Sequence, residues 1–110
     1  MTDRCDDFLD HMRQAARDAC VFVEGLDISG FRHDKRTQQA VIMSLVIIGE
    51  AASKIMDRNP GFIKQHPEIP WRQMRGMRNR IAHGYFDINL DVVWETVQTA
   101  FRTERKTVCP

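Results

Sequence analysis

The sequence predicts an all-α protein, an up-and-down bundle of four amphipathic helices. Apolar residues recur every three or four positions along four segments, which is the spacing that lines one face of a helix. Glycine, proline or asparagine separates these segments, and none of them shows the alternation typical of strands. The chain has 110 residues, 43% hydrophobic and 28% charged, an ordinary globular balance. We therefore expect residues 1–110 to form a single domain with one small core.

The first helix is expected over about residues 3–24. Its apolar stripe consists of Phe8, Met12, Ala15, Ala19 and Val23. Gly25 predicts its end, and the segment 29–31 (Ser-Gly-Phe) predicts a turn.

The second helix is expected over about residues 34–58. The segment 41–48 is apolar nearly all round and could be a buried strand taken alone, but the helix formers on both sides decide for a helix. Such a helix must be covered on more than one side, by the centre of a bundle or by a partner subunit. Its apolar run is far shorter than the roughly 20 residues that span a bilayer, so we expect no membrane partner. The stripe of this helix comprises Val41, Leu45, Ile48, Ala52 and Ile55.

A connector with room for a short helix leads from residues 59–61 (Asn-Pro-Gly) to the third helix, expected from Pro70 to His83. Gly84 is expected just after its end, in a left-handed conformation. The last helix should begin near Asn89, a good N-cap. Its stripe consists of Leu90, Val93, Val97 and Phe101, helped by Trp94 and Ala100.

Gly49 and Gly76 lie inside predicted helices, where each costs roughly 1 kcal/mol relative to alanine. Close approach of another backbone would explain their presence. Tolerance of neutral glycines explains it equally well.

Charge is unevenly distributed, although the formal net charge is only +1. Residues 1–30 carry seven acidic side chains against three arginines, whereas residues 61–85 carry five basic side chains against Glu68 alone. The three cysteines, Cys5, Cys20 and Cys109, form no C-x-x-C pair, so we expect neither a disulfide framework nor a zinc site. The N-terminal segment lacks the features of a signal peptide, and we expect a cytoplasmic protein. The basic residues of 61–85 are Lys64, Arg72, Arg75, Arg78 and Arg80.

The segment 78–85, Arg-Asn-Arg-Ile-Ala-His-Gly-Tyr, combines residues suited to phosphate chemistry. Arginine binds phosphate oxygens through two parallel hydrogen bonds, and histidine can exchange a proton near neutral pH. On one helix, Asn79 and His83 are only about 40° apart, on a polar face shared with Arg72, while Arg78 and His83 are about 140° apart. Either Arg78 wraps round the helix end near Gly84, or a second copy of the helix meets the first across a two-fold axis. We prefer the homodimer.

The opposite side of this helix, with Met74, Met77 and Ile81, should face the core. Taken singly, the polar features also have structural explanations: a solvated arginine face, a histidine that interacts with the helix dipole, and a tyrosine used in packing. His11, His33 and His66 show no spacing typical of a metal site, and we expect no cofactor.

Segment 78–85 matches the R-x-x-x-x-H-x-Y motif of the HepT-like toxins of the HEPN superfamily, which it resembles down to the asparagine after the arginine. The resemblance extends to residues 47–52, 69–77 and 86–94, in the same order. It implies a homodimeric helical bundle that acts as a metal-independent endoribonuclease, the toxin of a type II/VII-like toxin-antitoxin pair. The implied partner is an MntA-type nucleotidyltransferase antitoxin, which neutralises the toxin by transferring AMP to the motif tyrosine, here Tyr85.

By this resemblance Arg78 and His83 are catalytic. His83 could remove the proton of a ribose 2′-hydroxyl while Arg78 stabilises charge on the phosphoryl oxygens. Asn79 could orient His83 or an RNA oxygen. The phosphates of the RNA substrate flanking the cut would be held by Arg72, Arg75 and Arg80.

Two other functions remain open at this point. One is a non-catalytic helical module that binds nucleotide, RNA or the transferase through the same arginines. The other is a structural helical dimer whose basic face is only solvated.

Overall fold

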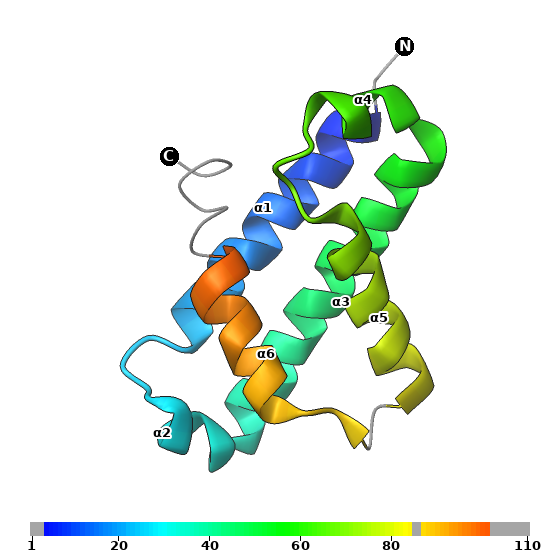
Figure 1. Ribbon diagram of the computed structural model, residues 1–110. Helices are drawn as coiled ribbons and strands as arrows, with labels where there is room; N and C mark the ends of the chain where they lie inside the picture. Colours follow the sequence, from blue (N-terminus) through cyan, green and yellow to red (C-terminus); the bar gives the residue numbers. More distant parts are fainter. Residues whose placement is uncertain (1–3, 85–86, 102–110) are drawn as a thin grey trace.

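The computed structural model describes residues 4–84 and 87–101, and the regular secondary structure within these ranges is entirely helical (Figure 1). The predicted all-α class is confirmed. The four predicted segments correspond to α1, α3, α5 and α6, and two short helices lie between them. The elements are α1 (Arg4–Phe22), α2 (Ile28–Arg32), α3 (Lys35–Arg58), α4 (Pro60–Gln65), α5 (Trp71–Gly84) and α6 (Leu90–Thr96), which continues into the π-helical turn η2 (Val97–Phe101).

The centre of the molecule is α3, which packs against α1 and α5, while η2 packs against α1 (Figure 1). All five residues of the apolar stripe predicted for α3 are buried. Met43 and Ile47 remain 57% and 39% exposed, so the apolar middle of α3 is covered only in part. By length and composition α3 could also cross a membrane, but the buried central helix of a folded domain meets the same criterion.

The short helix α2 replaces the turn predicted at residues 29–31, and that prediction was wrong. The Asp27 side chain caps this helix by accepting a hydrogen bond of 2.7 Å from the backbone N–H of Gly30. Phe31 is fully buried, with its ring centroid 5.4 Å from that of Trp94. Capping and burial of one aromatic side chain therefore stabilise a turn of helix here.

The left-handed glycine is Gly25, with φ 79°, and not Gly84. The prediction for Gly84 was wrong because α5 continues through this residue, so its backbone stays helical. The predicted cap at Asn89 is confirmed: its side chain accepts from the N–H groups of Asp91 and Val92 at 2.9 and 3.3 Å. The side chains of Ala100 and Phe101, expected in the stripe of the last helix, lie outside the described residues.

Helices α2 and α6 are joined by a bidentate ion pair between Arg32 and Asp91, with both N···O distances at 2.9 Å. These hydrogen bonds lower the pKa of the Asp91 carboxyl group, and the positive charge of Arg32 also lowers it. The pair fixes the start of α6, which follows the segment carrying the sequence motif.

At Gly49, α3 and α5 approach each other closely. A Cβ atom added there would overlap the Cβ of Arg78 and lie 2.8 Å from the carbonyl oxygen of Met74. Of the two explanations left open by the sequence, close approach holds for Gly49. Gly76 has no such neighbour, because an added Cβ would meet nothing within 4 Å.

Candidate functional site

The motif residues within the described part of the chain all lie on α5. The inward side of this helix is apolar, with Met74 and Ile81 buried and Met77 packed against the core, as predicted. The opposite side carries the polar face expected from helical periodicity. Its exposed residues include Arg72, Asn79, Arg80 and His83.

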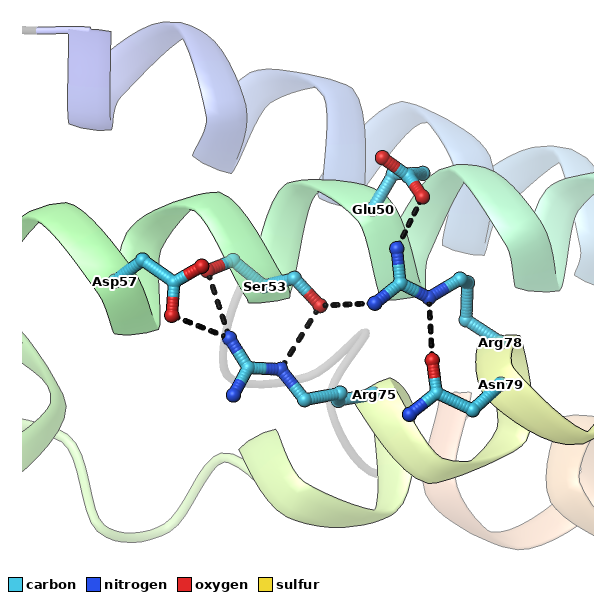
Figure 2. A network of polar contacts seen from close by, with 6 residues as sticks. All are labelled: Glu50, Ser53, Asp57, Arg75, Arg78 and Asn79. Carbon is cyan, nitrogen blue, oxygen red and sulfur yellow. Dashed lines mark hydrogen bonds and ion pairs between the residues drawn. The ribbon is translucent and has the colours of Figure 1, made fainter.

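Arg78 extends from α5 toward α3, and its side chain is only 23% exposed (Figure 2). One terminal nitrogen, Nη1, donates to the carboxylate of Glu50, and Nη2 donates to the hydroxyl of Ser53 at 3.1 Å. Its Nε donates to the side-chain oxygen of Asn79 at 2.9 Å. Because a guanidinium group has five N–H donors, two remain for an anion. The network therefore holds Arg78 in one orientation without using all its donors.

Arg75 lies one turn earlier on α5 and contacts the same edge of α3 (Figure 2). It donates to the hydroxyl and carbonyl oxygens of Ser53, both at 3.1 Å, and to the Asp57 carboxylate at 2.7 Å. We refer to Glu50, Ser53, Asp57, Arg75, Arg78 and Asn79 as the α3–α5 polar network. Together with Lys54, five of them line a hollow of about 350 Å³.

His83 lies apart from this network, exposed in the last turn of α5. The Arg78 side chain runs to α3 and does not wrap round the helix end near Gly84. Asn79 uses its carbonyl oxygen to accept from Arg78, so this oxygen does not orient His83 here. A single chain thus presents the cation and the imidazole on different sides of α5.

The three arginines predicted to bind phosphate fall into different surroundings. Arg75 belongs to the network, Arg72 lines a hollow of about 530 Å³ that also includes Lys64, and Arg80 lines one of about 280 Å³ beside the start of α6. Tyr85 lies outside the described residues. Within residues 4–84 and 87–101, no three His, Cys, Asp or Glu side chains group so as to hold a metal ion.

Sequence analysis missed the acceptors on α3. Glu50, Ser53 and Asp57 are separated by three and four positions, so they form one polar edge in the second half of the helix. Arg75 and Arg78 are also three apart. These two matching spacings could have predicted that α3 and α5 contact each other through polar and charged side chains.

Comparison with known proteins gives the family. Residues 12–108 match the family model described as "Ribonuclease HepT-like". The chain belongs to the HepT-like family. The "Probable ribonuclease HepT" of Thermococcus cleftensis is 40% identical over 92 residues, which cover 84% of this chain and 81% of the relative.

Two further relatives of this HepT-like chain have names that begin "Putative RNase". One protein of Methanocaldococcus jannaschii is 36% identical over 90 residues, which cover 82% of this chain and 72% of that relative. A protein of Caldanaerobacter subterraneus subsp. tengcongensis is 32% identical over 90 residues, which cover 82% of this chain and 78% of that relative. No solved structure matches. The predicted family is confirmed, and segment 78–85 lies within the matched region.

Proposed function

We propose that this HepT-like protein is a metal-independent endoribonuclease that acts on RNA in the cytoplasm. The observation that carries the proposal is the state of Arg78: a family motif arginine whose guanidinium is oriented by three acceptors while two of its N–H donors remain for a phosphate group. Such a pre-oriented cation is suited to stabilising charge that develops on phosphoryl oxygens.

His83 supplies the proton transfer. It accepts the proton of a ribose 2′-hydroxyl, whose oxygen forms a bond to the adjacent phosphorus as the bond to the 5′-oxygen of the next nucleotide breaks. The products are a 2′,3′-cyclic phosphate and a 5′-hydroxyl, which gains its proton from a protonated imidazole or from water. Arg72 and Arg80, both exposed, hold flanking phosphates, so RNA binding weakens as salt rises.

The proposed working unit is a homodimer. Arg78 and His83 of one chain lie on different sides of α5, so the Arg78 of one protomer is proposed to work with the His83 of the other. Two large apolar side chains of α3, Met43 and Ile47, remain 57% and 39% exposed and support contact with a second copy. They lie seven and three residues before Glu50, the ion-pair partner of Arg78, and so on the same side of α3.

The purified wild-type protein should cleave RNA in the presence of EDTA and leave 2′,3′-cyclic phosphate ends, because the 2′-oxygen is the nucleophile and no metal takes part. End-group analysis of a labelled oligonucleotide measures this. Its matched control is an oligonucleotide with 2′-deoxyribose at the cleaved position, which should remain intact. Binding of RNA without cleavage across pH 6–8 would contradict nuclease activity and favour the non-catalytic binding module.

The protein is further proposed to be the toxin of a toxin-antitoxin pair, with Tyr85 as its site of inactivation. Transfer of AMP from ATP to the phenol oxygen by an MntA-type nucleotidyltransferase releases pyrophosphate and leaves a phosphodiester two residues after His83. A negative phosphate and a nucleoside there compete with RNA for the arginines of α5. Inactivation by occupancy and charge requires no conformational change.

Coexpression with such a transferase should raise the intact mass of the protein in steps of one AMP, because Tyr85 is the acceptor. The chain has only one tyrosine, so Tyr85→Phe should remove the entire mass gain. Intact-mass spectrometry measures both forms, and the Tyr85→Phe protein should keep its RNA cleavage. A mass gain that persists in Tyr85→Phe would place the modification elsewhere.

A further inference from the structure

We infer that Ser53 is the positioning residue for Arg78, an inference that rests on the proposed ribonuclease function. Ser53 is one of two buried polar residues found in the described part of the chain, with 6% of its surface exposed. Its hydroxyl oxygen accepts from Nη2 of Arg78 and from Nε of Arg75, both at 3.1 Å. The two guanidinium groups therefore meet on one oxygen atom of a buried residue (Figure 2).

The chemistry of a hydroxyl group explains why serine suits this place. Its oxygen has two lone pairs, enough for one N–H from each arginine. It carries no net charge, so its hydrogen bond to Nη2 of Arg78 adds no negative charge to that already supplied by Glu50. A second carboxylate at the position of Ser53 would compete further with the phosphate for the guanidinium.

The rest of the network holds this arrangement from both ends. Along the α3–α5 polar network the order is Asp57, Arg75, Ser53, Arg78 and Glu50. A carboxylate therefore flanks each arginine on the side away from the serine. Arg75 also donates to the backbone carbonyl of Ser53, which ties its guanidinium to α3 itself. The positively charged guanidinium groups of Arg75 and Arg78 are thus held side by side. In this arrangement Arg75 holds Ser53 in place through its two hydrogen bonds to that residue.

The acidic residue at the other end, Glu50, cannot replace this function. Its side chain is about half exposed, and it contacts a different nitrogen, Nη1. Exposed ion pairs contribute little and are screened by salt, whereas the hydrogen bond from Arg78 to Ser53 is partly buried and restricts geometry more strongly. Loss of Ser53 should therefore loosen the guanidinium, because Nη2 loses its acceptor while only Nη1 and Nε keep theirs, Glu50 and Asn79.

The experiment compares Ser53→Ala and Ser53→Cys with Ser44→Ala. Cysteine is close to serine in shape but accepts hydrogen bonds weakly, so it serves if alanine disturbs folding. Ser44 is the matched control: it is equally buried on α3, but its hydroxyl donates to the carbonyl of Ala40 within the same helix. We expect Ser53→Ala and Ser53→Cys to lower kcat for RNA cleavage by about 10- to 100-fold with little change in KM. Ser44→Ala should cleave like wild type.

A double-mutant cycle separates positioning from general damage. If Ser53 acts through the guanidinium, replacing it in an Arg78→Lys background should have little further effect on kcat. Equal losses in both backgrounds, or wild-type kcat in a folded Ser53→Ala protein, would overturn the inference while leaving the nuclease proposal intact. Wild-type protein that fails to cleave RNA would instead contradict the proposed function itself. In that case side-chain NMR still tests the role of Ser53. Ser53→Ala should speed hydrogen exchange of the Arg78 Nε–H, and an unchanged exchange rate would contradict the inference about Ser53.

Discussion

His83→Ala is expected to lower kcat for RNA cleavage by about 10²- to 10⁴-fold, because the variant has no group to accept the 2′-hydroxyl proton. The affinity for RNA should change little, since the arginines remain. The imidazole is exposed at the end of α5, so its removal should alter the free energy of unfolding by only about 0.5 kcal/mol. Single-turnover cleavage and urea unfolding of the same samples measure both quantities.

The matched control for this prediction is His11→Ala, which removes another exposed histidine, from α1, and should cleave like wild type. Arg78→Lys is informative for the other half of the site. Lysine keeps the charge but lacks the planar fork that contacts Glu50, Ser53 and Asn79, so most activity should be lost. Cleavage by His83→Ala at the wild-type rate would refute the role of the imidazole.

A mixing experiment tests whether the site is shared between protomers. Arg78→Ala and His83→Ala proteins should each be inactive alone. After unfolding and refolding together in equal amounts, half the dimers contain one chain of each kind, and each such dimer has one complete pair of Arg78 and His83. The mixture should recover about a quarter of wild-type activity if the pair forms across the two-fold axis. No recovery is expected if the pair lies within one chain.

Gly49→Ala is expected to destabilise the fold by about 1–3 kcal/mol or more. The added methyl group would overlap the Cβ of Arg78 and press on the backbone carbonyl of Met74, and neither can yield without moving α5. Movement of α5 away from α3 would also lengthen the bonds from Arg78 to Ser53, so activity should fall with stability. The midpoint of urea unfolding, at fixed protein concentration and with an unchanged slope, measures the loss.

Gly76→Ala is the matched control and should have the opposite sign. It lies in the interior of α5, and an added Cβ meets nothing within 4 Å. Alanine should therefore raise the free energy of unfolding by about 0.5–1 kcal/mol through helix propensity. If both substitutions had the same effect, the close contact of α3 and α5 at Gly49 would be wrong.

Much of the site's scaffold could be predicted from periodicity. The spacing of Met74, Met77 and Ile81 predicted which side of α5 faces the core, and therefore that Arg72, Asn79 and His83 would share the exposed side. The cap at Asn89 was also predictable, because a cap depends on a side chain and the backbone two or three residues later. These features depend on neighbours along the chain.

Two other predictions failed where the local residues permitted two backbone conformations. Residues 29–31 have the composition of a turn, yet burial of Phe31 against Trp94 favours a helix. Gly84 suits a left-handed helix end, yet α5 continues through it and Gly25 takes that conformation instead. At residues 29–31 the local residues permitted either backbone, and the contact between Phe31 and Trp94, distant in the sequence, favours the helix.

The sequence by itself determined the all-α class, the four main helices and the placing of motif residues 78–83 on the third of them, because helical periodicity and turn residues act over a few positions. The tertiary structure alone decided where Arg78 points. Its acceptors Glu50 and Ser53 are 28 and 25 residues away, and they reach it only because Gly49 lets α3 and α5 approach closely. The register between two helices depends on how their side chains interlock, and neither helix's own pattern contains that information.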